Sequence, residues 1–551
     1  MIRNFGRSAI YLQTNGSNVV EGNYLGLDST GTAARANGWD GVSIVSGSNN
    51  RIGGTTVAQR NVIAGNAEDG VYVEAGSTGN TIQGNYIGLN ASGTAAVPNG
   101  WRGIVLNGGT NVVGGTASGA GNTVSGNGWR GILIAGSSNV VQGNIVGLDA
   151  SGNAVVSNGS NGISIEGGSG NVIGGSTASA RNVISGNNQA QDVADGIWIT
   201  NSTGNVIRGN YIGTDATGTL ARGNYNAGVA IWSDGNFVGG TGTGDGNLIA
   251  YNGSDGVIVA QASRDNRILG NRFTGNGGLA IDLGDDGVTL NDGSTSGGDN
   301  NREIDYPVFT AASISGGLLT VSGYVGSAPG QSTFANDRVE IYVADGDPSG
   351  YGEGRAYLGF LTTDGGGRFS GSISSGPLVV GQRVTGTTTD SEGNTSEFGA
   401  NYTATQVASA PGTGPLAEWR FEEAAWTGAS DQVLDSSGNA NHLTSYGGAN
   451  TAAATGGSGT CRYGDFNGGS DRVGTYTDQR MSMSVAVTAM AWIYARALPT
   501  NDIMTILSKD SNYEFHLDTG GQIYWWWGGG ARALTTSGTA LAPGSKRKYR
   551  K

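Results

Sequence analysis

The chain contains a single cysteine, Cys461, only two histidines and, before its last few residues, a single lysine, Lys509. One cysteine excludes an intrachain disulfide framework and a zinc site built from cysteines. The formal net charge of −13 at pH 7 argues against nucleic acid as a partner. No apolar run is long enough to span a membrane, and no basic-plus-apolar export signal follows Met1. The acidic, lysine-poor composition fits an exported protein.

Proline is scarce as well, whereas glycine is abundant: of 551 residues, 9 are proline and 103 are glycine. With 37% hydrophobic residues the composition is neither disordered nor collagen-like. Residues 41–66, GVSIVSGSNNRIGGTTVAQRNVIAGN, hold three short apolar pieces, each bounded by Gly and Asn. The first piece, G-[VI]-x-[VIL], returns about every 30 residues up to Gly256, and a period of about 60 residues overlies it. Such repetition predicts a solenoid.

Within each repeat the apolar residues alternate, as in Val42 and Ile44, which is the periodicity of a β-strand. Three short strands per repeat, stacked strand on strand, predict a parallel β-helix over residues 1–283, with some ten coils at roughly 4.8 Å per coil. The asparagines that end the motif N-x-[VI]-x-G-N are expected to stack into a structural amide ladder. They are Asn23, Asn85, Asn144, Asn210 and Asn271.

The longer period means that alternate coils carry different loops. In every second coil the motif [LT]-[DN]-x-[ST]-G-[TN] places an Asp or Asn at the same position, namely Asp28, Asn90, Asp149 and Asp215. An Asx-turn, in which the side chain accepts backbone N–H groups, is the prediction for these residues. Calcium between the loops is the alternative, although calcium needs six or more oxygen ligands.

Past the repeats the composition changes in steps. Residues 284–305 are rich in Asp and Asn and are expected to cap the open end of the coils. Residues 306–405 alternate apolar and polar residues, which predicts a small β-sandwich, and residues 406–415 read as a linker. More aromatic residues over 416–545 predict a third all-β domain. Residues 546–551 form an abruptly basic tail, for which we expect an artificial or out-of-frame end, with a genuine basic tail as the alternative.

The motifs GVxI, NxIxGN, NxIGGT and NYIGLDxxGT resemble those of bacterial right-handed parallel β-helix repeat proteins of the pectate-lyase-like superfold. GLAIDLGDDGVTLND, DPSGYGEGRAYLG and DSEGNTSEF look like the cap and Ig-like module that follow such repeats in large secreted bacterial surface proteins. PLAEWRFEE, MAWIYAR and QIYWWW are similar to laminin-G-like, or concanavalin A-like, jelly rolls, most of all to the version in the pilus biogenesis protein MshQ. The resemblance implies an all-β chain whose jelly roll is incomplete, because KRKYRK replaces the next expected strand.

Relatives of this superfold include lyases and hydrolases of acidic polysaccharides, which need paired carboxylates, or calcium plus a basic residue, on an outward strand face. Both histidines, His442 and His516, lie in the last domain. The middle residues of the G-[VI]-x-[VIL] pieces should point outward, and none is ionisable: Ser43, Tyr72, Val105, Leu133, Ser164, Trp198, Ala230 and Ile258. We therefore expect an outer face without an ionisable cluster and without a catalytic site. The loop residues Asp149 and Asp215 are the alternative catalytic residues.

Two acidic clusters are dense enough for calcium, the one cofactor that the sequence suggests. The first comprises Asp282, Asp285, Asp286, Asp292 and Asp299 in the cap. The second comprises Asp345, Asp347 and Glu353 in the predicted sandwich. Solvated turn acids are the simpler interpretation of both clusters.

Two groups of tryptophans could stack on sugar rings. Trp39 and Trp101 hold equivalent positions two coils apart, and Trp129 repeats the motif NGWRG in a neighbouring coil. Packing beneath a loop is the alternative for these three residues. In the last domain Trp525, Trp526 and Trp527 alternate along a predicted strand, so at least one should face outward.

The sequence thus predicts a non-catalytic, secreted or cell-surface protein in which a β-helix rod serves adhesion or carbohydrate binding. The expected partner is an extracellular glycan or a host or cell-surface protein, and the chain is expected to be monomeric. A polysaccharide lyase or glycoside hydrolase is the first alternative, and a purely structural stalk is the second.

Overall fold

The computed structural model divides the chain into two units, residues 1–407 and 408–551. The residues that the structure describes are 1–13, 16–188, 194–295, 300–406, 417–421, 423–438, 441–453, 462–466, 472–474, 490–500, 504–509, 513–527 and 546–550. The helical segments among them are short 3-10 turns: η1 (Val57–Gln59), η2 (Ala178–Ala180), η3 (Asn300–Glu303) and η4 (Ser332–Phe334). The all-β fold class predicted from the sequence is confirmed.

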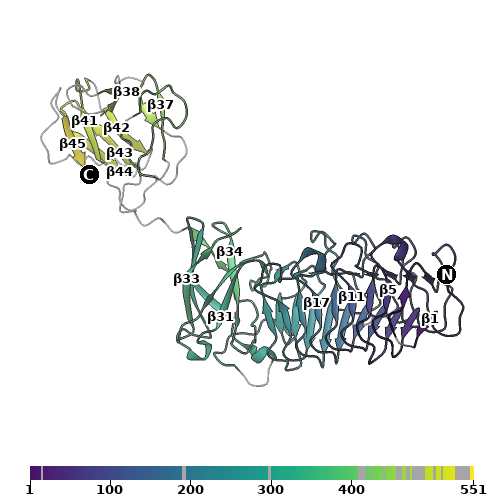
Figure 1. Cartoon of the computed structure of the whole chain (residues 1–551). Helices are drawn as coiled ribbons and strands as arrows, with labels where there is room; N and C mark the ends of the chain where they lie inside the picture. The colour runs from purple at the N-terminus through teal and green to yellow at the C-terminus, as the bar shows by residue number, and fades with distance from the viewer. Residues whose placement is uncertain are drawn as a thin grey trace. The chain divides into compact units, whose positions relative to one another are not determined.

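The first unit begins with a stack of coils in which each coil adds one strand to each of three parallel sheets (Figure 1). The ten-stranded sheet contains β1 (Ile10–Leu12), β4 (Val42–Ile44), β7 (Val71–Val73), β10 (Ile104–Leu106), β13 (Ile132–Ile134), β16 (Ile163–Glu166), β19 (Ile197–Thr200), β22 (Val229–Trp232), β25 (Val257–Val259) and β28 (Ile281–Leu283).

Two nine-stranded sheets complete the coils. One contains β2 (Val19–Val20), β5 (Arg51–Gly53), β8 (Thr81–Gln83), β11 (Val112–Gly114), β14 (Val140–Gln142), β17 (Val172–Gly174), β20 (Val206–Arg208), β23 (Phe237–Gly239) and β26 (Arg267–Leu269). The other contains β3 (Tyr24–Leu25), β6 (Val62–Ile63), β9 (Tyr86–Ile87), β12 (Thr123–Val124), β15 (Ile145–Val146), β18 (Val183–Ile184), β21 (Tyr211–Ile212), β24 (Leu248–Ala250) and β27 (Arg272–Thr274).

The register of these sheets stacks like residues on like residues. Ile104 pairs with Ile132, which pairs with Ile163 in the next coil. These side chains point into the coils, where β-branched residues pack well in strands and are fully buried. Each buried side chain contributes roughly 1.5–3 kcal/mol of transfer free energy, so the repeated Val and Ile positions account for the continuous core.

Asparagine side chains form three continuous ladders along the described coils. In one ladder the five predicted asparagines alternate with Asn61, Asn122, Asn182 and Asn247. The side-chain amide of Asn144 donates to Oδ1 of Asn182 at 3.0 Å, while its own Oδ1 accepts from Asn122 at 2.9 Å. The other two ladders run from Asn18 to Asn266 and from Asn37 to Asn276. An amide both donates and accepts, so each ladder can continue from coil to coil.

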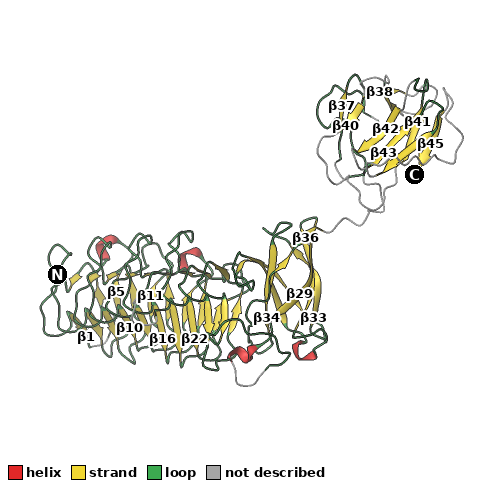
Figure 2. Cartoon of the chain, turned by 180° about the vertical axis from the view of Figure 1, so that it is seen from behind, coloured by secondary structure: helices red, strands yellow, loops and turns green. Residues whose placement is uncertain are grey.

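A β-sandwich follows the coils in the same unit (Figure 2). Its first sheet has the order β33–β30–β29–β36, and its second sheet the order β32–β31–β34–β35. The strands are β29 (Pro307–Ser315), β30 (Leu318–Val325), β31 (Arg338–Ala344), β32 (Gly354–Thr362), β33 (Arg368–Ser374), β34 (Arg383–Thr389), β35 (Tyr402–Thr403) and β36 (Thr405–Gln406). Phe309, Val321, Ile341 and Phe369 fill the space between the sheets.

Carboxylates of the sandwich accept the N–H groups at the end of the coils. Glu340 accepts from Gly270 at 2.8 Å, Glu353 accepts from Asn276 at 3.2 Å, and Glu397 accepts from Leu283 at 3.0 Å. The predicted cap, residues 284–305, contributes Asn301, whose Oδ1 accepts the N–H of Asn266 at 3.0 Å. The end of the coil stack is thus closed largely by the sandwich rather than by the acidic segment alone.

The second unit consists of small sheets. They pair β37 (Thr444–Tyr446) with β40 (Arg472–Gly474), β38 (Asn450–Ala453) with β39 (Arg462–Asp465), β41 (Met490–Tyr494) with β45 (Lys546–Arg550), and β42 (Met504–Lys509) with β43 (Tyr513–Leu517) and β44 (Ile523–Trp527). Strand β45 is built from the basic residues predicted as a tail, so a strand exists where the sequence predicted none. Trp426, Val433 and Leu443 form a small buried cluster.

Candidate functional site

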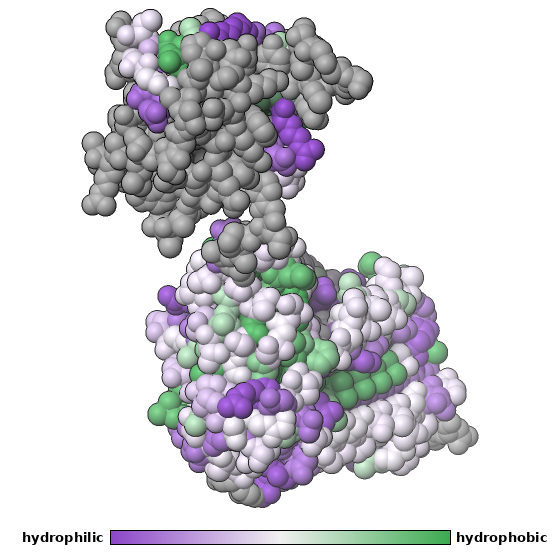
Figure 3. All heavy atoms as spheres, turned by 90° about the vertical axis from the view of Figure 1, so that its left-hand side faces the viewer, coloured by the Kyte–Doolittle hydropathy of each residue, from purple (hydrophilic) through white to green (hydrophobic). Residues whose placement is uncertain are grey.

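On the outer face of the ten-stranded sheet, several residues in the middle of the strands are buried. Val105, Leu133 and Ala230 lie there, yet they are only 1%, 7% and 4% exposed. On the side of the coils that Figure 3 shows, an apolar band lies between more polar borders.

Ionisable groups lie on this face two residues before the strands. They are Asp40, Asp69, Arg102, Arg130, Asp195 and Asp255, and each is followed by glycine. The prediction of an outer face without an ionisable cluster is therefore wrong, because it considered only the residues inside the strands. In the sequence, these ionisable residues could have been found at the position directly before each G-[VI]-x-[VIL] piece.

Tryptophan and arginine side chains alternate across this face. The Arg102 guanidinium lies 5.4 Å from the ring centre of Trp101 and 5.7 Å from that of Trp129. Arg130 lies 4.0 Å from Trp129 and 5.5 Å from Trp198. These distances are within the range of cation–π attraction.

Trp198 continues the series, because its ring meets that of Trp232 edge to face at 5.8 Å. We call Trp101, Arg102, Trp129, Arg130, Trp198 and Trp232 the Trp–Arg stripe. It extends from β10 to β22, four coil steps or about 19 Å. Trp101 is 51% exposed and Trp232 is 37% exposed, so both ends of the stripe are open to solvent. Trp39 is also exposed, but it stacks with Arg7 at 4.9 Å, outside the stripe.

Each arginine of the stripe is held by a carboxylate. Arg102 Nε donates to Asp69 Oδ1 at 3.0 Å, and Arg130 forms an ion pair with Glu166. Asp40, in the preceding coil, contacts Asp69. Its Oδ1 accepts the N–H of Asp69 at 3.1 Å, and its Oδ2 accepts the Ser43 hydroxyl at 2.6 Å. Burial raises the pKa of both Asp40 and Asp69, against the opposing effect of Arg102. The guanidinium groups are thereby held in place beside the tryptophans.

The loop acids predicted as turn residues, or as catalytic residues, close their own loops. Asp215 Oδ1 accepts the N–H groups of Thr219 and Leu220, both at 2.9 Å. Asp28, Asn90 and Asp149 accept the equivalent N–H groups in their coils. Burial opposes ionisation of Asp215, but hydrogen bonds from Thr217 and these N–H groups outweigh it and lower its pKa to about 2.

The calcium candidates engage backbone groups. Asp282 accepts the N–H groups of Asp285, Asp286 and Gly287. Asp292 accepts from Ser294, Asp345 from Asp347, and Asp347 from Ser349. Glu353 meets Asn276, and Asp299 lies outside the described residues. Within the described part of the chain, no group of three or more His, Cys, Asp or Glu side chains is placed to hold a metal ion.

The remaining candidates lie in the second unit. Trp525, Trp526 and Trp527 belong to strand β44, and their side chains lie outside what the structure describes, as does Cys461. His442 Nδ1 accepts the N–H of Asp435 at 3.0 Å, and His516 Nδ1 lies 3.0 Å from the Thr505 hydroxyl. No described helix is long and apolar enough to cross a membrane.

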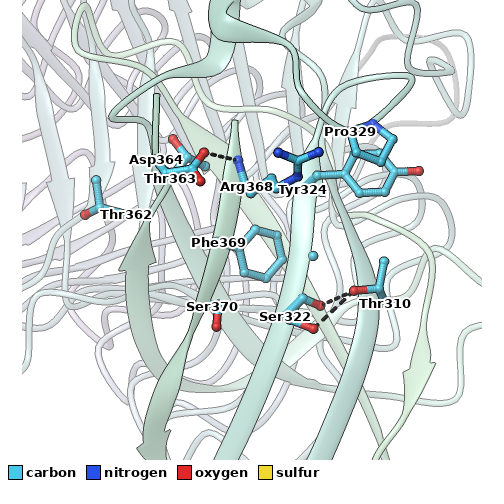
Figure 4. Close-up of a pocket in the computed structure, with 11 residues that line it drawn as sticks. Thr310, Ser322, Tyr324, Pro329, Thr362, Thr363, Asp364, Arg368, Phe369 and Ser370 are labelled. Carbon is cyan, nitrogen blue, oxygen red and sulfur yellow. Dashed lines mark hydrogen bonds between the residues drawn. The ribbon is translucent and has the colours of Figure 1, made fainter. Parts of the chain in front are cut away.

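The sandwich has a hollow of about 490 Å³ lined by residues of β30, β33 and the end of β32 (Figure 4). Tyr324, Pro329 and Arg368 lie at its upper edge in that view. Its one carboxylate, Asp364, accepts the N–H groups of Gly366 and Arg368 at 2.8 Å and 3.0 Å. The lining contains no second acid and no histidine, and so offers no pair for acid–base chemistry.

No family model matches the chain. Among solved structures, the chain is similar to PfbA, a surface adhesin of Streptococcus pneumoniae. The two are 14% identical over 51% of this chain and 76% of that chain, with a TM-score of 0.22.

Proposed function

We propose that the protein is a non-catalytic, secreted or cell-surface protein that binds an extracellular glycan through the Trp–Arg stripe, in the service of adhesion. The observation that carries this proposal is the series of indole and guanidinium groups across five neighbouring strands, open to solvent at Trp101 and Trp232. Indole faces pack against the apolar faces of sugar rings. Guanidinium groups donate to sugar hydroxyl and carboxylate oxygens in a fixed fork.

The geometry of the stripe favours a chain-like ligand over a small one. Its aromatic groups recur along the coil axis over about 19 Å, and its arginines are already oriented by Asp69 and Glu166. Preorientation reduces the side-chain entropy that a ligand must offset on binding. The resemblance to bacterial surface proteins with Ig-like and laminin-G-like modules fits the same role, with the second unit as a further binding module.

The test is a glycan array with the full chain, followed by affinity measurements on any retained glycan. We expect the double variant Trp101→Ala/Trp232→Ala to bind at least tenfold more weakly, because each sugar–aromatic stack is worth about 1 kcal/mol. Phe237→Ala is the matched control, because Phe237 is also 37% exposed but lies on another sheet. If no glycan is retained, or if the control loses as much affinity, the stripe is a structural stack and the chain a stalk.

A polysaccharide lyase or glycoside hydrolase is the second candidate. It is supported by Asp40 and Asp69, two buried acids with raised pKa values beside Arg102. Assays for reducing ends and unsaturated products on acidic glycans would detect such an activity. Turnover that disappears in Asp69→Asn, but not in Asp215→Asn, would replace the binding proposal by an enzymatic one.

A further inference from the structure

Two aspartates face each other at one end of the second sandwich sheet. Strands β31 and β34 are antiparallel, with Val339 opposite Thr388 and Arg338 opposite Thr389. One further step along this register places Asp337 directly across from Asp390. Asp337 lies two residues before Val339, so it points to the same side as Val339, toward the space between the sheets.

One oxygen of the Asp337 carboxylate is buried without a donor. Asp337 is 6% exposed, and its Oδ2 has no hydrogen-bond partner among the described residues. The Thr388 hydroxyl on the same side of the sheet is also buried without a partner. A buried carboxylate that lacks a donor is costly, and two like charges directly across a strand pair repel each other.

Asp390 accepts three hydrogen bonds within its own turn. Its Oδ1 accepts the N–H groups of Gly393 at 2.7 Å and Asn394 at 2.9 Å, and its Oδ2 accepts the Asn394 amide at 2.8 Å. No arginine or lysine in the described residues forms an ion pair with either aspartate.

We propose that Asp337, Asp390 and Thr388 form a calcium-binding site in the sandwich. The chemistry of the three groups fits a hard divalent cation, because all the ligands are oxygens and two are carboxylates. A cation between the carboxylates removes their repulsion and gives the unpartnered oxygens of Asp337 and Thr388 a ligand. Main-chain carbonyls and water would complete the coordination. With two carboxylates, the affinity should fall in the range of extracellular modules, about 0.1–1 mM.

The experiment is equilibrium dialysis of the metal-stripped full chain against calcium, combined with thermal unfolding. We expect one ion per chain and a rise of about 2 °C in melting temperature at ten times the dissociation constant. Asp337→Asn and Asp390→Asn should each weaken binding at least tenfold. Thr388→Val, which suits the apolar side of the sheet, should weaken it severalfold without unfolding the sandwich.

Two controls separate this site from other acids. Asp364→Asn removes an exposed acid of the same domain, and Asp347→Asn tests the loop of residues 345–353; both should bind calcium as the unaltered chain does. Binding that is lost in Asp347→Asn but kept in Asp337→Asn would overturn the proposal. So would the absence of any calcium-dependent rise in the melting temperature of the unaltered chain, because the two carboxylates would then hold no cation.

Discussion

The coils and the sandwich bury their polar side chains by different chemistry. The ladders along the coils consist of neutral amides, each of which donates to the next coil and accepts from the previous one. Where the sandwich meets the coils, three of the accepting groups are the carboxylates of Glu340, Glu353 and Glu397, which only accept. The ladder from Asn37 to Asn276 shows the change directly, because it ends on Glu353. A repeating stack needs groups that propagate, whereas its end needs groups that terminate.

The ladders and their junction with the sandwich should respond differently to pH. Amides do not titrate, so the ladders should add little to the pH dependence of the free energy of unfolding. Burial raises the pKa of Glu397 to about 7 and also raises the pKa of Glu353 well above its usual range. The junction with the sandwich should therefore respond to pH between acid and neutral values, while the ladders do not.

The largest expected effect comes from placing a carboxylate inside a ladder. Asn144→Asp keeps the shape of the side chain but sets an acceptor against Val113 O, Gln142 O and Asn182 Oδ1. We expect a loss of about 3–5 kcal/mol in unfolding free energy, because a buried charge then faces three acceptors in place of the hydrogen bonds that the amide donated to them. Chemical unfolding measures it. Asn153→Asp, on an exposed loop residue, should change stability by less than about 0.5 kcal/mol; equal losses would contradict the distinction.

Replacing a buried carboxylate by an amide should instead stabilise the end of the ladder from Asn37 to Asn276. Glu353→Gln keeps an oxygen for Asn276 and removes a buried charge. A raised pKa means that the contribution of Glu353 is most favourable below 4.5, its ordinary value, and falls as pH rises toward the raised pKa. We expect the variant to match the unaltered chain near pH 4.5 and to exceed it by about 1–2 kcal/mol at pH 9. Melting temperatures across this range measure the difference, and Glu74→Gln, on a partly exposed residue, should show no such divergence.

The smallest effect is expected in the loops, with the opposite dependence on pH. The pKa of Asp215 is lowered to about 2, so its contribution is present above 3.8 and is lost as pH falls through 2. Asn90 accepts the same N–H groups in its own coil, so Asp215→Asn should cost less than about 1 kcal/mol at pH 7. The cost should vanish near pH 2, as measured by thermal unfolding. A cost that grows on acidification would contradict the lowered pKa; Asp286→Asn, on an exposed acid, serves as the reference.

Much of the coil architecture could be predicted because the interactions repeat. Inward-facing residues such as Ile104 and Ile132, and amides such as Asn85 and Asn144, stack on their own equivalents, so sequence period and spatial neighbour coincide. The Trp–Arg stripe could be predicted only in part. Trp101 and Trp129 share the motif NGWRG, but Trp198 and Trp232 occupy other positions of the repeat and join the stripe only through side-chain length and direction.

The sequence by itself determined the strands, the three-sided coil and its amide ladders, because each contact joins residues one period apart. Only the tertiary structure decided which groups end those ladders and which tryptophans meet. Glu353 reaches Asn276 across 77 positions and Glu397 reaches Leu283 across 114. No period relates these residues, and carboxylates on one strand find N–H groups on another only after both domains have folded against each other.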